Sequence, residues 1–159
     1  MFYYHIIYIF MLTILLLALA GAVIAAVVGT FWYSPGTPMG KIHMRYLGFD
    51  KLSDEEKKKK IEEAKPTMPK TYLAQTLLSF LTAFSVVFVV IMTVRNGVSL
   101  GIAIAFVAMN WLCFIVPTIG SAILWGNCDR AIAWKKFISD ILSNLVTVLL
   151  TALLASLFA

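Results

Sequence analysis

An aspartate and several polar residues recur along one face of the last apolar segment of the chain. Their spacings of four, three and four residues put them on one stripe of an α-helix: Asp140, Asn144, Thr147 and Thr151. Asp140 is the only acidic residue inside any long apolar segment. A carboxylate within a membrane is costly and marks a functional site by default, so the stripe predicts a narrow polar route in which Asp140 handles protons or cations.

A structural interpretation of Asp140 stands beside the functional one. Lys136 lies four residues earlier, about one helical turn away, where its ammonium group can form an ion pair with the Asp140 carboxylate. The sequence leaves open whether Asp140 only pairs with Lys136 near the membrane border or lines a polar pathway.

Polar residues in two other apolar segments extend the candidate site. Between helices in lipid, polar side chains mark the faces where helices meet. Gln75 begins a stripe with Ser79 and Thr82, and Asn110 lies within the third segment. These positions predict either interhelical hydrogen bonds or a pathway, and the full candidate polar face is Asp140, Asn144, Thr147, Thr151, Asn110 and Gln75.

The remaining sequence offers no pattern typical of an enzyme. It has no Ser/His/Asp set, no second acid beside Asp140 and no glycine-rich phosphate loop. The cysteines Cys113 and Cys128 have neither CxxC spacing nor a neighbouring histidine. We therefore expect no catalytic residues, no metal and no cofactor.

Composition shows which environment must hold these residues. Of the 159 residues, 61% are apolar and 13% charged, and the mean hydropathy is +0.90. Soluble domains average about 45–50% apolar and about 25% charged residues. A soluble domain of this size buries only about 70% of its unfolded surface and has no room for so much apolar area. The composition predicts an integral membrane protein.

The apolar segments define the architecture. Four of them reach the roughly 20 residues that a helix needs to cross a bilayer, and they cover residues 6–33, 71–94, 98–125 and 134–158. We predict an all-α, four-helix membrane bundle, with residues 1–159 forming a single transmembrane domain and residues 34–70 a cytoplasmic insert.

The basic residues predict the orientation. Of the 13 lysines and arginines, all but Arg95 fall in the insert or at the third connection, which lie on the same side of a four-span bundle. Basic residues favour the cytoplasmic side, so both termini should be non-cytoplasmic. We expect the plasma membrane, with an organelle inner membrane as the alternative, and the basic charge requires no nucleic-acid partner.

Aromatic residues mark the expected cytoplasmic border. Amphipathic rings favour the headgroup level, and the predicted interface anchors are Trp32, Tyr33, Trp125 and Trp134. Within the insert, Thr37-Pro38 starts a short amphipathic helix that we expect to lie on the membrane surface. Ser53 and Glu56 form a capping box that starts a charged cytoplasmic helix.

Small residues in the first span predict a close helix contact. Gly21, Ala25 and Gly29 recur every four residues, the small-xxx-small pattern that lets backbones approach in lipid. The pattern does not tell whether the partner helix belongs to the same chain or to another.

Two stretches carry a family resemblance. "GTFWYSPGTPMGKIHMRYLGF" and "SAILWGNCDRAIAWKKFISDILSNLVTVLLTALLA" resemble the small membrane proteins grouped as domain of unknown function 1761. The resemblance covers nearly the whole chain, and its most specific part is Trp32-Tyr33-Ser34-Pro35 with Gly40-Lys41. It implies a four-span bundle but no activity, so no functional residue is carried over.

The sequence is consistent with three functions. The first is a homo-oligomeric ion or proton channel or a small transporter, in which the Gly21 face joins protomers and the Asp140 stripe lines the route. The second is an accessory or scaffold subunit of a larger membrane complex, and a weaker third is a lipid-contacting protein. The expected partners are thus the bilayer and either copies of this chain or other membrane subunits.

Overall fold

The computed structural model describes residues 2–126 and 128–159, and every regular element within these ranges is a helix. Four stretches are long and apolar enough to cross a membrane: Ile7–Trp32, Met68–Arg95, Leu100–Ile123 and Arg130–Ser156. They belong to α1 (Phe2–Trp32), α4 (Met68–Arg95), the α5–α6 stretch and α7 (Arg130–Ser156). The predicted all-α architecture with four spans is confirmed, with boundaries that differ by a few residues.

The third span changes its helical winding midway. It consists of α5 (Leu100–Asn110), one π-helical turn η2 (Trp111–Ile115) and α6 (Val116–Leu124). Pro117 has no N–H group and cannot continue the hydrogen-bond ladder of an α-helix. The wider turn absorbs this interruption, and the Thr118 hydroxyl donates to the Phe114 carbonyl at 2.6 Å.

The insert folds into α2 (Pro38–Tyr46), the 3₁₀ turn η1 (Phe49–Lys51) and α3 (Asp54–Ala64). Thr37 caps α2 by accepting a hydrogen bond from the Gly40 N–H at 2.9 Å. The capping box of α3 is confirmed, because Ser53 and Glu56 exchange both of its hydrogen bonds. Gly48 takes a φ of 74° between α2 and η1, a conformation that favours glycine.

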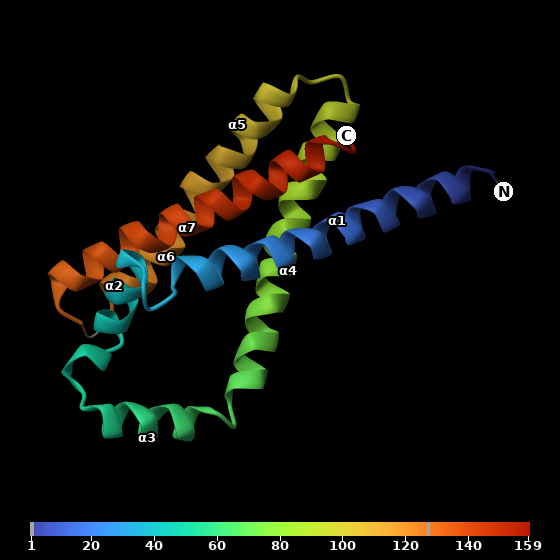
Figure 1. Cartoon of the computed structure of the whole chain (residues 1–159). Coiled ribbons are helices and arrows are strands. Elements are labelled where there is room, and N and C mark those ends of the chain that lie inside the picture. The colour runs from blue at the N-terminus through green and yellow to red at the C-terminus, as the bar shows by residue number, and fades with distance from the viewer. Residues whose placement is uncertain (1, 127) are drawn as a thin grey trace.

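Helix α7 lies at the centre of the bundle. It contacts α1, α4, α5 and α6 as well as α2. Figure 1 shows α1 on one side of α7 and α5 on the other. Helix α4 crosses α1 and then diverges from the bundle toward its own N-terminus, where α3 connects it back to α2 (Figure 1).

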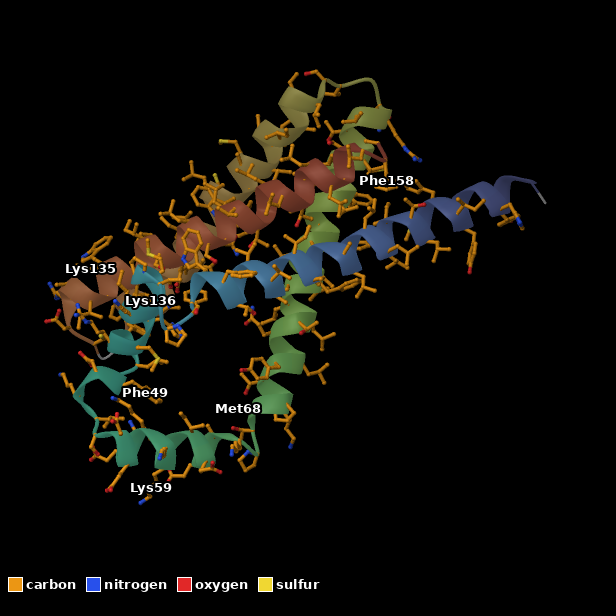
Figure 2. All side chains as sticks on the ribbon, viewed as in Figure 1. Phe49, Lys59, Met68, Lys135, Lys136 and Phe158 are labelled. Carbon is orange, nitrogen blue, oxygen red and sulfur yellow. The ribbon has the colours of Figure 1, made fainter. Side chains whose placement is uncertain are left out.

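The hydrophobic core occupies the half of the bundle that carries the chain termini. Its fully buried members come from the N-terminal half of α1, the C-terminal half of α4 and the C-terminal half of α7: Ile14, Val87, Val90, Ile91, Ala152 and Ala155. At the same end the Arg95 guanidinium lies 4.9 Å from the Phe10 ring centroid and donates to the Phe158 carbonyl at 3.4 Å. Figure 2 places Phe158 at this end and Lys136 at the opposite one.

Candidate functional site

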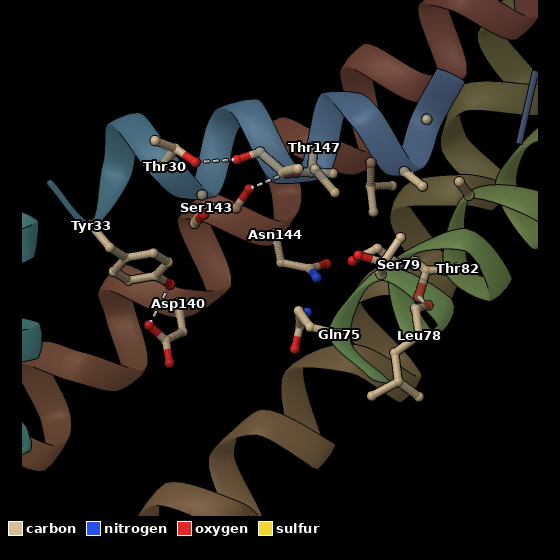
Figure 3. A pocket seen from close by; sticks show the side chains of 18 of the residues that line it. Thr30, Tyr33, Gln75, Leu78, Ser79, Thr82, Asp140, Ser143, Asn144 and Thr147 are labelled. Atoms are coloured by element: carbon tan, nitrogen blue, oxygen red, sulfur yellow. Dashed lines mark hydrogen bonds between the residues drawn. The ribbon is translucent and has the colours of Figure 1, made fainter. Parts of the chain in front are cut away.

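A cavity of about 1020 Å³ separates α1, α4 and α7 in the half of the bundle away from the termini. Helix α1 contributes side chains too small to fill it, among them Ala22, Ala25, Ala26 and Gly29. Because α4 diverges from α1 here, no larger side chain closes the space, and Figure 3 shows the opening between the three helices.

The polar stripes of α4 and α7 face each other across this cavity. Gln75, Ser79 and Thr82 line it from α4. Asp140, Asn144, Thr147 and Thr151 line it from α7, and Figure 3 shows Gln75 and Asn144 pointing into the space from opposite sides. The stripes predicted separately from the spacing of each segment thus belong to one site.

The threonine hydroxyl groups of the cavity already donate to their own helices. Thr147 donates to the Ser143 carbonyl at 3.0 Å, Thr82 to the Leu78 carbonyl at 3.1 Å and Thr30 to the Ala26 carbonyl at 2.8 Å. Their oxygens remain acceptors toward the cavity. The amides of Gln75 and Asn144 add side-chain N–H donors to the lining.

The Asn144 amide carries a buried acceptor without a partner among the described residues. Its Oδ1 is buried and finds no hydrogen-bond partner among residues 2–126 and 128–159. An unsatisfied buried acceptor costs about 1–3 kcal/mol, so the position is unfavourable unless something else supplies a donor.

Asn110 does not belong to this site. It lies exposed on α5, where its Nδ2 donates to the Phe106 carbonyl at 2.9 Å. The prediction that it shares the polar face is wrong because α5 lies on the other side of α7 from α1 (Figure 1). The spacing of polar residues shows which face of a helix is polar, but not which neighbour that face meets.

A charged cluster stands at one border of the cavity. Lys136 forms an ion pair with Asp140 Oδ2, and the two side chains are only 9% and 18% exposed. The Tyr33 hydroxyl donates to Asp140 Oδ1 at 2.7 Å, so both carboxylate oxygens are bound. Lys136 Nζ lies 5.1 Å from the Tyr33 ring centroid and 5.6 Å from that of Tyr46, which adds cation–π attraction. Asp140 is thus both paired and exposed to the cavity.

Trp32 and Tyr33 have a different role from the predicted one. The Trp32 indole Nε1 donates to Ser139 Oγ at 3.1 Å, so adjacent residues at the end of α1 bind adjacent residues of α7. Both were expected to point toward lipid headgroups, but α7 supplies their hydrogen-bond partners instead. Trp125 and Trp134 are 89% and 51% exposed, which fits interface anchors.

The corner between α1 and α2 holds these contacts in place. A Cβ at Gly40 would lie 1.9 Å from the Ser34 carbonyl oxygen, so only glycine permits this turn. The Thr37 hydroxyl lies 2.8 Å from both the Trp32 and the Ser34 carbonyl oxygens and donates to them. The Trp-Tyr-Ser-Pro stretch therefore begins a tight corner that docks onto α7.

Helix α2 was expected to lie on the membrane surface, and it packs on α7. His43 is half-buried, and its ring centroid lies 5.0 Å from that of Tyr33. Burial lowers the pKa of His43 below its ordinary 6.5, the nearby Lys136 lowers it further, and Asp140 opposes both. No spacing or motif in the sequence identified Ser139, His43 and Tyr46 as part of this cluster.

The small residues of the predicted row on α1 have two different roles: one packs against other helices, and the others line the cavity. A Cβ at Gly21 would lie 2.6 Å from Ala83 Cβ and 2.8 Å from Thr151 Cγ2, so α1, α4 and α7 meet there within one chain. A Cβ at Gly29 would meet nothing within 4 Å. Ala25 and Gly29 line the cavity, so the close contact predicted for the whole row is found at Gly21.

No group of three or more histidine, cysteine, aspartate or glutamate side chains within the described residues is placed to hold a metal ion.

The sequence matches one known family over most of its length. The family model described as "Protein of unknown function (DUF1761)" covers residues 16–156, which confirms the resemblance seen in the sequence. Neither the comparison with curated proteins nor the comparison with solved structures finds a match.

Proposed function

The chain belongs to the DUF1761 family and has four helices able to span a membrane, and from this premise we propose that it is a small transporter that carries a polar solute through the cavity between α1, α4 and α7. The observation that carries the proposal is a cavity with polar stripes on two of its walls, open toward one end of the bundle and closed toward the other. A transporter needs such a site near the middle of its spans, with access to one side at a time.

The open end lies toward the insert. Several lining residues there are exposed, including Pro35, Tyr72, Gln75 and Thr76. The charged cluster of Lys136 and Asp140 borders the same region. From the basic residues of the insert we infer that this end faces the cytoplasm and that both termini lie on the other side.

The closed end begins where Gly21, Ala83 and Thr151 approach one another. Beyond this point lie the fully buried aliphatic side chains of Val87, Val90 and Ile91. A permanently open channel needs a continuous polar route, whereas this arrangement requires helices to move before a solute can leave. The Asp140 stripe faces a space within one chain, so a route along it needs no second copy.

A second candidate is an accessory subunit of a membrane complex. Residues 69–78 of α4 are exposed at every position, and they include polar Gln75. A helix of another protein could fill the cavity and bind Gln75 and Asn144. An accessory subunit should purify together with a partner protein, and the chain alone should show no transport.

Flux measurements with a cavity-filling variant test the proposal. Purified protein in liposomes is assayed with protons, K⁺ and small neutral solutes. Gly29→Leu is expected to fold normally and to reduce flux to the level of empty liposomes, because Gly29 lines the cavity and has free space around it.

Gly101→Leu is the matched control for this experiment. Gly101 is an exposed helical glycine of α5 whose Cβ would also meet nothing within 4 Å, but it does not line the cavity. It should transport like the wild type. Equal flux in wild type and Gly29→Leu, or no flux above empty liposomes for any probe, would remove the transporter function and favour the subunit.

A further inference from the structure

The charges that border the cavity compensate one another. Lys136 and Asp140 form an ion pair, and the Tyr33 hydroxyl binds the second carboxylate oxygen. His43, the other ionisable group at this border, is neutral at pH 7 because burial and Lys136 disfavour its cation. A strong cation site usually includes a free carboxylate beside its neutral oxygens, and an anion site needs a free basic group. The described lining offers neither kind of uncompensated charge.

The uncharged groups of the cavity provide both donors and acceptors. The threonine oxygens accept, because their protons are bound to helix carbonyls. The Gln75 and Asn144 amides face each other from α4 and α7 (Figure 3) and can donate as well as accept. Oδ1 of Asn144 is buried without a partner in the part of the chain that the structure describes. A ligand that enters the cavity can donate a hydrogen bond to this acceptor once α4 and α7 adjust around the ligand.

We propose that the cavity binds an uncharged solute with several hydroxyl or amide groups, such as a small polyol, and that Gln75 and Asn144 are its two main binding residues. This inference rests on the proposed transport function and names its substrate class. The alanine and glycine face of α1 forms the third wall, where the carbon skeleton of the solute lies against apolar surface. A volume of about 1020 Å³ exceeds what one small polyol needs, so water accompanies it.

The ion pair then has a positioning role. Lys136 and Asp140 hold the end of α1 and helix α2 against α7 through Tyr33 and Tyr46. The solute does not need to displace either charge, because both are bound to protein partners. Transport of a neutral solute should therefore be independent of membrane potential.

The test compares osmotic and ionic flux in the same proteoliposomes. Glycerol and xylitol entry is followed by light scattering after rapid mixing, proton entry with a pH-sensitive dye, and K⁺ flux with a potential-sensitive dye. Wild-type protein should accelerate glycerol or xylitol entry above empty liposomes, with no change on applying a membrane potential. Proton and K⁺ flux should stay at the empty-liposome level.

Leucine variants identify the binding residues. Gln75→Leu and Asn144→Leu are expected to lower solute entry at least tenfold, with the protein still eluting as the wild type on gel filtration. Asn110→Leu is the matched control, since Asn110 is a span asparagine exposed outside the cavity. Gln75→Asn, which keeps an amide, should recover part of the flux.

Each other outcome overturns a specific statement. Proton or K⁺ flux without solute entry would overturn the neutral substrate and leave the transport function in place. Solute entry that is unchanged in Gln75→Leu and Asn144→Leu would overturn the assignment of these residues. No flux of any probe would overturn the transport function together with this inference.

Discussion

The two halves of the bundle are built from the same three helices but differ in what lies between them. Toward the termini, α1, α4 and α7 meet through aliphatic side chains such as Ile14, Val90 and Ala152, all fully buried. Toward the insert, the same helices carry glycine, alanine and polar residues and enclose the cavity. The size and polarity of successive side chains thus decide where one helix bundle is closed and where it is open.

The two halves also differ in how they are held together. Lipid tails are as apolar as leucine, so helices in a membrane associate through packing and hydrogen bonds rather than through the hydrophobic effect. The terminal half relies on close aliphatic packing. The cavity half lacks that packing and relies on the polar contacts of Trp32, Tyr33 and Lys136 with α7 or within it. Substitutions that weaken one of these contacts should therefore affect the two halves differently.

The largest effect is expected from Lys136→Ala. Removing one partner of a buried ion pair leaves an uncompensated charge and typically costs about 3–5 kcal/mol. The cost should appear as a lower free energy of unfolding in a detergent titration, with faster amide exchange in α2 and the start of α7. Amide exchange of 86–91 in α4 should remain slow, because this stretch lies in the other half.

A double variant is the control for that experiment. Lys136→Met with Asp140→Leu removes both charges and should recover most of the lost stability. If Lys136→Ala alone unfolds at the wild-type detergent concentration, the ion pair does not hold the cavity half together.

An intermediate effect is expected from Gly21→Ala. The added Cβ would lie 2.6 Å from Ala83 Cβ, too close for two non-bonded carbon atoms, so the helices must shift. Overpacking of this kind costs about 1–3 kcal/mol. Gly29→Ala is the matched change on the same helix and should cost nothing, because its Cβ meets open space. Equal losses of stability in both variants would mean that the two halves are packed alike.

A smaller effect is expected from Trp32→Phe. The substitution keeps an aromatic ring but removes the N–H that donates to Ser139. The loss should be about 0.5–1.5 kcal/mol, the net contribution of one hydrogen bond. Ser139→Ala should cost a similar amount, and the double variant little more than either. Trp134→Phe, at an exposed position, should leave the free energy of unfolding nearly unchanged. A larger loss of stability for Trp134→Phe than for Trp32→Phe would contradict the docking of the α1–α2 corner onto α7.

The smallest effect is a dependence of stability on pH. The pKa of His43 is lowered in the folded protein, so the unfolded chain binds more protons below about pH 6.5. Neutral His43 therefore leaves the free energy of unfolding undiminished at pH 7.5. The free energy of unfolding falls as the pH drops below 6.5 toward the lowered pKa of His43. Lys136 and Asp140 on α7 and Tyr33 before α2 face this ring. His43→Gln should flatten the unfolding profile between pH 7.5 and 5.5, and an unchanged slope would remove His43 as its cause.

Local rules predicted the elements well. Hydrophobic length located the four spans, Thr37-Pro38 located the start of α2, and the Ser53–Glu56 capping box located that of α3. Periodicity also identified the polar faces of α4 and α7. These features depend on residues within one or two turns of each other, so the sequence contains all the information that they need.

Contacts between distant residues were not predictable in the same way. Trp32 and Tyr33 have the composition of interface anchors, yet their partners Ser139 and Asp140 lie 107 residues away. The contrast between Gly21 and Gly29 depends on the angle at which α4 crosses α1, which no spacing within α1 reveals. Asn110 was misplaced for the same reason, because the order of helices around α7 is a property of the whole bundle.

The central claim is that water and solute reach the middle of α7 from the insert side but not its last turns. Its most direct test is labelling of single cysteines by a charged, membrane-impermeant thiol reagent, in a background of Cys113→Ser and Cys128→Ser. Asn144→Cys should react when the reagent is on the side of α2 and α3, and Ala152→Cys, fully buried in the closed half, should not react from either side. Similar reactivity at both positions, or labelling of Asn144→Cys by lipid-soluble reagents alone, would contradict the account.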